Sequence, residues 1–222
     1  MRNEIETQRR RNSERGYSIV EMVIVTLTIF IVSAMAVLQL QPAWQQIQSN
    51  TGMAQVKTTL RQARETAISQ RRAIVVQFMN AAVGTACLPS GNTKNCVALT
   101  QMVVTPGTPP TQAPAANPFL IVPIESNVGL LSFAGEPDTP DAFIGAGPAA
   151  PTGLYTGAVA GAPPSGLQFQ SDGTFTNGTA NPINLTIFLG ETNIPTTARA
   201  ITILGNTGKV AGYAGTGLAW FQ

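Results

Sequence analysis

The chain has 222 residues, enough for one domain and a membrane segment. Its charged fraction of 11% is less than half the share of about 25% usual in globular proteins, and its formal net charge of +2 excludes a strongly basic, nucleic-acid-binding domain. Because the chain has no histidine and only two cysteines, it lacks the commonest general base and cannot build a four-cysteine zinc site. We therefore expect no enzyme activity, no small-molecule substrate, no metal and no cofactor.

A polar leader, residues 1–16, comes first and holds five of the 13 basic residues. An uncharged apolar run from Met22 to Leu38 follows, and as a helix it would be roughly 25 Å long. Adding Tyr17–Val20 brings the run to the thickness of a bilayer core, which predicts a transmembrane helix over residues 17–41. The positive-inside rule then places the leader in the cytoplasm and the rest of the chain in the periplasm.

A different processing site lies inside the apolar run. Ala34-Met35-Ala36 fits the small-residue pattern of a signal-peptidase site. Cleavage after Ala36 would release a secreted soluble domain that begins at Val37. The length of the apolar run and the residues Gly16–Glu21 argue against this alternative.

Residues 42–72 predict an amphipathic helix that continues the first one. Pro42 removes a backbone hydrogen bond and is expected to kink or interrupt the helix, and Gly52 is a second weak point. Apolar residues at spacings of three and four form one narrow stripe, and charged residues lie off it. This charged face is either a solvated surface or a surface for an anionic partner. The stripe consists of Val56, Leu60, Ala63 and Ala67, and the charged residues are Lys57, Arg61, Arg64, Glu65 and Arg71.

After residue 72 the pattern changes from a helical period to alternation, which predicts a β-rich domain over residues 73–222. Two Gly/Pro-rich stretches, 105–118 and 134–166, lack the material for a core and are predicted to be long loops. The predicted strands are Ala73–Met79, Val97–Val104, Phe119–Ile124, Val128–Phe133, Leu167–Gln170, Ile183–Leu189, Arg199–Leu204 and Lys209–Tyr213.

Two short segments predict hairpin turns. Asp172-Gly173 separates two alternating segments and is expected to form a turn in which both central residues have positive φ. Residues 205–208 (GNTG) separate the last two predicted strands in the same way. With Lys209 they contain the Gly-Lys of a phosphate-binding loop, but the spacing is too short and Val210 follows the lysine, so this segment is predicted to be a turn.

The segment Gly16-Tyr17-Ser18-Ile19-Val20-Glu21-Met22 lies between the basic leader and the apolar run. It resembles the type III signal of type IV pilins and type II secretion pseudopilins, although that family usually has Phe where Tyr17 stands. The resemblance implies that a prepilin peptidase cleaves after Gly16 and methylates the new N-terminus at Tyr17. It also implies that Glu21 pairs with the N-terminal amine of a neighbouring subunit during filament assembly. The simpler interpretation of Glu21 is an acid in a first helical turn, stabilised by the helix dipole.

Three further segments narrow the resemblance to the GspH/FimT class of minor pseudopilins. Residues 63–68 (ARETAI) precede the first predicted strand, as the AR-x-x-AI element of that class does. LQFQSDGTFTNG and RAITILGNTGKV resemble its hairpin and its last strand pair, whereas residues 80–166 resemble nothing. The class implies an α+β fold, in which a long N-terminal helix, transmembrane in its first half and amphipathic in its second, packs on an antiparallel β-sheet domain.

The resemblance also implies a structural role, as a minor pilin or pseudopilin of a type II secretion pseudopilus or a type IV pilus. The partners would be prepilin peptidase, other pilin subunits and the bacterial inner membrane, which the chain would cross once. Its C-terminal domain would lie in the periplasm or in a filament. Whether the machine is a secretion system, a pilus or a competence filament stays open, as does a minor or major role.

An alternative function is that of a DNA-binding minor pilin that acts in natural DNA uptake. Such binding would use a basic C-terminal region with several phosphate contacts. Arg199 and Lys209 are the only positive charges after Lys94, so nucleic acid is not the expected partner.

Cys87 and Cys96 bracket a short turn-rich segment, LPSGNTKN. In an oxidising periplasm we expect a disulfide bond between them, and because the loop is small it would stabilise the chain by about 3 kcal/mol or less. Two free buried thiols are the alternative. The only acidic cluster, Glu136, Asp138 and Asp141, is spread through a Pro-rich loop and lacks the frame of a calcium site.

Overall fold

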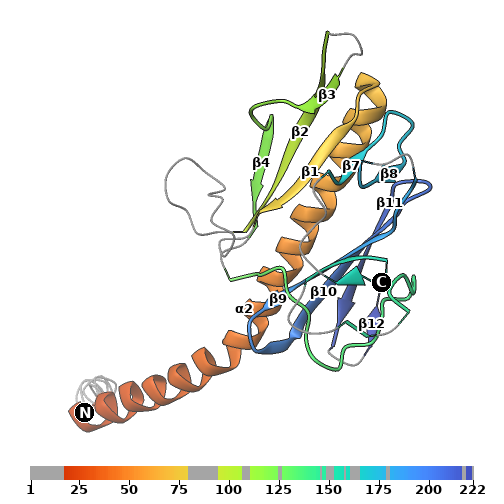
Figure 1. Cartoon of the computed structure of the whole chain (residues 1–222). Helices are drawn as coiled ribbons and strands as arrows, with labels where there is room; N and C mark the ends of the chain where they lie inside the picture. The colour runs from red at the N-terminus through yellow and green to blue at the C-terminus, as the bar shows by residue number, and fades with distance from the viewer. Residues whose placement is uncertain are drawn as a thin grey trace, which may run out of the picture. The chain divides into compact units, whose positions relative to one another are not determined.

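The computed structural model of the chain describes residues 18–79, 95–106, 111–124, 127–145, 147–148, 153–157, 159–160, 166–178, 181–216 and 219–221. The fold is α+β: one long N-terminal helix is followed by strands that pair antiparallel throughout (Figure 1). The predicted fold class is therefore confirmed, with two sheets in the domain. The chain divides into two compact units, Met1–Trp44 and Gln45–Gln222, and each is described by itself.

The helix, α2, runs from Ile19 to Gln70 and has 52 residues. Pro42 lies inside it, so of the two predicted effects, a kink or an interruption, the structure excludes the interruption. A proline in a helix interior loses one backbone hydrogen bond, but the turns on both sides keep theirs. The helix ends where Arg71 adopts a left-handed φ of 51°, and the backbone N–H groups of Arg71 and Arg72 donate to the carbonyls of Ile68 and Ala67.

The first sheet has six strands in the order β3-β2-β1-β7-β8, and β4 pairs with β2. β4 pairs with the first half of β2 and β3 with its second half, both on the edge of β2 that faces away from β1. The strands are β1 (Ile74–Met79), β2 (Cys96–Thr105), β3 (Thr111–Pro114), β4 (Leu120–Pro123), β7 (Gln168–Phe169) and β8 (Phe175–Thr176).

The second sheet has six strands in the order β12-β11-β10-β9-β5-β6. Its centre is formed by β10, the longest strand with 11 residues, and by its two partners β9 and β11, which have 7 residues each. The strands are β5 (Leu154–Thr156), β6 (Val159–Ala160), β9 (Leu185–Glu191), β10 (Ile194–Leu204), β11 (Lys209–Gly215) and β12 (Trp220–Phe221).

The main core forms where the second half of α2 packs against both sheets. The predicted stripe is confirmed, because Val56, Leu60, Ala63 and Ala67 are each fully buried. Their cluster includes apolar side chains of the first sheet, such as Phe169, and of the second, such as Ile187 and Ile201. Burial of this stripe is the driving force that holds the helix on the domain.

A smaller core covers the other face of the second sheet. Ile144 and Tyr155 are buried there against Phe188, Ala200 and Tyr213. The ring of Tyr155 meets that of Phe188 edge-on at a centroid distance of 5.6 Å. The prediction that residues 134–166 form a loop without core material is therefore wrong, since this segment supplies buried side chains and the strands β5 and β6.

Three other predictions need correction. Residues 105–118, predicted to be a long loop, contain the strand β3, which pairs with the second half of β2. Residues Val128–Phe133 were predicted to be a strand, but they form none. Their single β-type contact is an isolated bridge between Gly129 and Gly190. The β7–β8 hairpin is confirmed, but its turn differs from the expected type. Gly173 has a φ of +85° and its N–H donates to the carbonyl of Gln170, whereas Asp172 is not left-handed. Its carboxylate instead accepts from the backbone N–H and the hydroxyl of Thr174.

Candidate functional site

Glu21 lies in the first turn of α2 and is its only charged residue before Lys57. The turn forms directly after Ser18, whose carbonyl accepts from the N–H of Met22 at 3.1 Å. The predicted cleavage and methylation residues, Gly16 and Tyr17, lie outside the described residues, so the processing site stays a prediction.

The first part of α2 is apolar on all sides. Its large side chains are exposed, with Ile19 at 83% and Phe30 at 75%. The hydroxyls of Thr26 and Thr28 donate to carbonyls one turn back, so they place no unpaired donor on this surface. Among the described helices, α2 is long and apolar enough to cross a membrane, with a mean hydropathy of 2.5 over its most apolar window. Ala34 and Ala36, of the alternative cleavage site, lie in the helix interior.

The second part of α2 carries a row of cations that faces β11. Lys57, Arg61 and Arg64 follow one another at spacings of four and three, which places them on one side of the helix. A β-carbon placed on Gly212 would lie 3.3 Å from Cδ of Lys57. The guanidinium of Arg61 donates to the carbonyl of Val210 at 3.3 Å.

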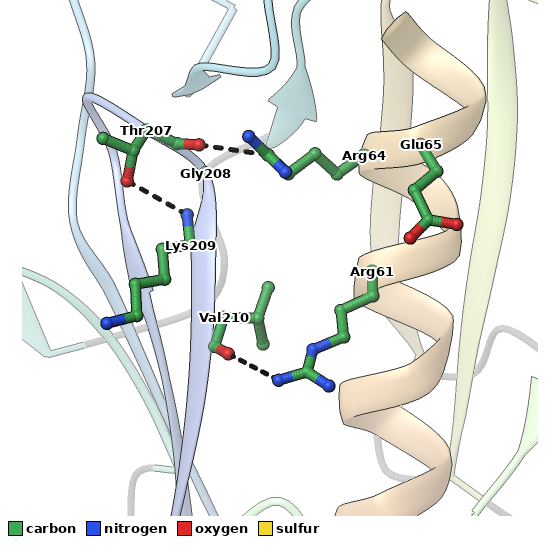
Figure 2. Close-up of a pocket in the computed structure, with 7 residues that line it drawn as sticks. All are labelled: Arg61, Arg64, Glu65, Thr207, Gly208, Lys209 and Val210. Carbon is green, nitrogen blue, oxygen red and sulfur yellow. Dashed lines mark hydrogen bonds between the residues drawn. The ribbon is translucent and has the colours of Figure 1, made fainter. Parts of the chain in front are cut away.

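Arg64 joins two turns that are distant in the sequence. Its Nε donates to the carbonyl of Thr207 at 3.0 Å, in the β10–β11 turn, and to that of Gly173 at 3.4 Å, in the β7–β8 turn. Figure 2 shows Arg61 and Arg64 extending from α2 toward the β10–β11 turn. Arg64 of the Ala63-Arg64 element therefore has a structural role, which the periodicity of the sequence did not reveal.

An open groove of about 580 Å³ lies between this part of α2 and the β10–β11 turn. Lys209 lines it at the start of β11, and its backbone N–H donates to the hydroxyl of Thr207 at 3.3 Å. Glu65 is the single acid in the lining (Figure 2). The lining residues are Arg61, Arg64, Glu65, Thr207, Gly208, Lys209 and Val210.

Arg199, one of the two C-terminal cations considered for DNA binding, is not a surface residue. Its side chain is 5% exposed, and its Nε donates to Oδ1 of Asn50 at 2.7 Å. Its NH1 donates to the carbonyl of Ala198 at 2.6 Å. Burial lowers the pKa of this guanidinium below its usual range. Arg199 therefore ties β10 to α2 and leaves Lys209 as the exposed C-terminal cation of the described chain.

Asp138 and Asp141, two of the three carboxylates in the segment after β4, accept hydrogen bonds within their own domain. Asp138 accepts from the N–H groups of Ile144 and Gly145 at 2.9 and 2.7 Å. Asp141 accepts from the hydroxyls of Thr202 and Tyr213.

Glu136 is 3% exposed, and its Oε2 accepts from the N–H of Phe133 at 3.0 Å, while its Oε1 has no hydrogen-bond partner among the described atoms. Burial raises the pKa of Glu136 to about 7. Sequence analysis placed all three acids in a loop and assigned them no role.

Cys96 is fully buried at the first residue of β2, where it pairs with Met79. Cys87 lies outside the described residues. The disulfide bond between the two therefore stays a prediction.

No protein-family model matches the chain, and no curated protein matches it. Among solved structures, it is similar to the type IV minor pilin FimU of Pseudomonas aeruginosa PAO1 in two crystal forms. In the P65 form the TM-score is 0.40 at 15% identity, over 73% of this chain and 90% of FimU. In the P21 form the TM-score is 0.39 at 16% identity, over 78% and 90%. FimU is a type IV minor pilin.

Proposed function

We propose that this protein is a pilin-like structural subunit, anchored and assembled through the first part of α2. The observation that carries the proposal is one helix with two different surfaces. Among the side chains that the structure describes between Ile19 and Leu40, the large apolar ones are exposed, and from Val56 to Ala67 the apolar stripe is buried in the core of the domain. An exposed apolar surface of this length needs a lipid or protein environment to cover it.

Glu21 supplies the specificity of assembly in this proposal. A charged side chain costs about 2.5–3.5 kcal/mol at the centre of a membrane helix, and ionisable residues within such helices are usually paired and functional. Glu21 lies in the first turn of an apolar helix, so we assign it a partner. The resemblance to the pilin signal supplies that partner, the N-terminal amine of a neighbouring subunit. In the proposed protein the amine belongs to Tyr17, after a prepilin peptidase has removed residues 1–16.

The arginine-rich leader supports a single orientation in the inner membrane. Basic residues stay on the cytoplasmic side, which would leave the Gln45–Gln222 unit in the periplasm. The proposed machine is a type II secretion pseudopilus or a type IV pilus.

The proposal is tested by substituting Glu21 in cells that assemble the filament. We expect Glu21→Gln to reach the membrane at the wild-type level but to enter sheared filaments at least about tenfold less, because a lost ion pair in a low-dielectric site costs more than 1.4 kcal/mol. The control is Glu21→Asp, which keeps the negative charge and should retain most of the incorporation. Immunoblots of membrane and filament fractions measure both, and wild-type incorporation of Glu21→Gln would refute the proposed role.

A nucleic-acid-binding role has no comparable support at the C-terminal cations, since Arg199 is buried.

A further inference from the structure

The β2–β3 hairpin, formed by residues 102–105 and by β3 (Thr111–Pro114), carries apolar side chains outside both cores. Figure 1 shows it at one end of the first sheet. Leu99 of β2 is fully buried in the main core, but Val103, four residues later on the same face, is 41% exposed. Val104 on the opposite face is 55% exposed, and all four residues of β3 are exposed. The hairpin is therefore a paired arm with two valines open to its surroundings.

The hairpin has no charge that would keep it from associating. Between Lys94 and Glu125 the sequence contains no Asp, Glu, Lys or Arg. Native sheets commonly place charged side chains on exposed edge strands, because charge opposes the association of one edge with another. A hairpin that exposes two valines without such charges needs a different hydrophilic group to protect it.

The outer edge of β3 is poorly suited to pairing with a further strand. The N–H of Ala115 donates to the carbonyl of Gln101, and antiparallel pairs of this kind recur at every second residue. Thr111, four residues earlier, therefore directs its N–H toward β2, while Gln112 and Pro114 face outward. Because proline has no N–H, Gln112 is the single N–H donor on the outer edge of β3. Addition of a strand at this edge therefore does not explain why the hairpin is exposed.

Thr111 presents a hydroxyl beside one of the exposed valines. Its side chain is exposed, and its Oγ1 has no hydrogen-bond partner among the described atoms. Ala113 pairs with Val103, and Thr111 lies two residues from Ala113 on the same strand, so all three side chains share one face of the hairpin. Since alanine is small, Val103 stays uncovered, and a group attached to Thr111 would lie diagonally next to it.

The composition around Thr111 indicates which group would be attached. Residues 105–118 contain five prolines and three threonines, and Thr/Pro-rich segments are typical of O-glycosylation. Pro109 and Pro110 directly precede Thr111 in the sequence. A glycan is large and hydrophilic, which is the protection that the uncharged hairpin lacks.

We propose that Thr111 is the acceptor of an O-linked glycan that covers the Val103 face of the hairpin. The donor is a sugar whose anomeric carbon is joined to a phosphate group. A base of the transferase takes the hydroxyl proton of Thr111, and Oγ1 forms a bond to the anomeric carbon. The bond from that carbon to the phosphate oxygen breaks, and the phosphate leaves with the electron pair, so the transfer needs no oxidant or reductant. The site does not involve Glu21 and is independent of the assembly role proposed for it.

The proposal is tested on the full chain, purified from membranes of the cells that naturally make it, by intact mass and by peptide mapping with electron-transfer dissociation. We expect a mass increase of at least one sugar, located at Thr111. Thr111→Ala should lose this increase, and Thr111→Ser, which keeps a hydroxyl, should retain it. Thr196→Ala is the matched control and should leave the increase unchanged. Thr196 is also an exposed strand threonine that follows a proline, but it lies outside the uncharged segment.

Light scattering tests the covering role separately from the modification itself. At equal concentration, Thr111→Ala should form larger particles than the wild-type protein, because Val103 is then uncovered. Combining Thr111→Ala with Val103→Thr should return the particle size toward that of the wild type. Thermal unfolding should be the same for Thr111→Ala and Thr111→Ser, since Thr111 is exposed and packs in neither core.

Three results would overturn the proposal. The first is an unmodified Thr111 in the protein from its natural cells. The second is a mass increase that persists in Thr111→Ala, because a different residue then carries the glycan. The third is association of Thr111→Ala that Val103→Thr does not reduce, which would show that the glycan does not act by covering Val103.

Discussion

Glu136 shows how a single buried carboxylate couples this domain to pH. Its side chain is 3% exposed, and one oxygen lacks a partner among the described residues, so the neutral form is favoured and the pKa rises from 4.5 to about 7. In the unfolded chain the group titrates near its ordinary value. The folded state therefore binds an extra proton between the two values, and the stability that this proton provides is present below pH 4.5 and lost as pH rises to about 7.

Chemical denaturation of the full chain at several pH values tests this coupling. We expect the free energy of unfolding to contain a component that falls by about 1–3 kcal/mol between pH 4.5 and pH 7 and is flat above. Glu136→Gln should abolish that component, and above pH 7 the variant should be the more stable protein. The control Glu65→Gln changes an exposed acid and should keep the wild-type pH dependence. A slope that survives in Glu136→Gln would assign the titration to another group.

Gly208 lies where two turns approach too closely for a side chain. Its φ is +62°, and a β-carbon there would collide with the carbonyl oxygen of Gly173, because Arg64 holds the two turns together. Gly157 has a similar φ of +58° but has nothing within 4 Å of the position of a β-carbon.

The two glycines form a matched pair for substitution. Gly157→Ala carries only the backbone strain and should destabilise the protein by about 1–2 kcal/mol. Gly208→Ala adds the collision and should cost at least about 2 kcal/mol more. Equal losses in thermal or chemical unfolding would mean that the two turns are not in contact.

At the scale of elements, the second half of α2 packs against both sheets and shares the main core with them. Leu60 is fully buried in the main core, and Ile68, two turns further along the same helix, is 41% exposed. Leu60→Ala should destabilise the domain by about 2–5 kcal/mol, whereas Ile68→Ala should cost less than about 1 kcal/mol. Unfolding in denaturant measures both, and similar losses would contradict the packing of the stripe.

The helix and most strands could be predicted because their patterns are local. Seventeen uncharged residues after Glu21 and the three-and-four spacing of the stripe each specify a helix within a few turns. The prediction that residues 134–166 contribute nothing to a core was wrong. Their buried side chains, such as Ile144 and Tyr155, occur singly among Gly and Pro, and they pack against strands that are distant in the sequence. Val128–Phe133 alternates like a strand, but Val128 fills the main core while Gly129 meets a single bridge partner.

The two candidate sites differ in the same way, because one depends on neighbours in the sequence and the other on contacts between distant segments. Glu21 could be predicted from its immediate neighbours, since a charge at the start of an apolar run is visible in the sequence. The groove could not, because Arg64 contacts Gly173 and Thr207, which lie 109 and 143 residues away along the chain. The burial of Arg199 likewise depends on Asn50, which is 149 residues away.

At the scale of the whole molecule, the proposed function depends on the chain keeping its apolar helix after processing. A prepilin peptidase would cut after Gly16 and leave Ile19–Gln70 intact, with Glu21 as the fifth residue of the mature chain. A signal peptidase would cut after Ala36, inside the helix, and would remove Glu21 together with most of the apolar surface. The two routes give mature chains that differ by 20 residues, since one begins at Tyr17 and the other at Val37.

The measurement that tests the account most directly is therefore the mature N-terminus, by intact mass and peptide sequencing of membrane fractions from cells with and without the prepilin peptidase. The account predicts an N-terminal, methylated Tyr17 that is lost when the peptidase is absent. An N-terminus at Val37 in both strains would contradict it, because the helix that carries Glu21 would then be missing from the mature protein.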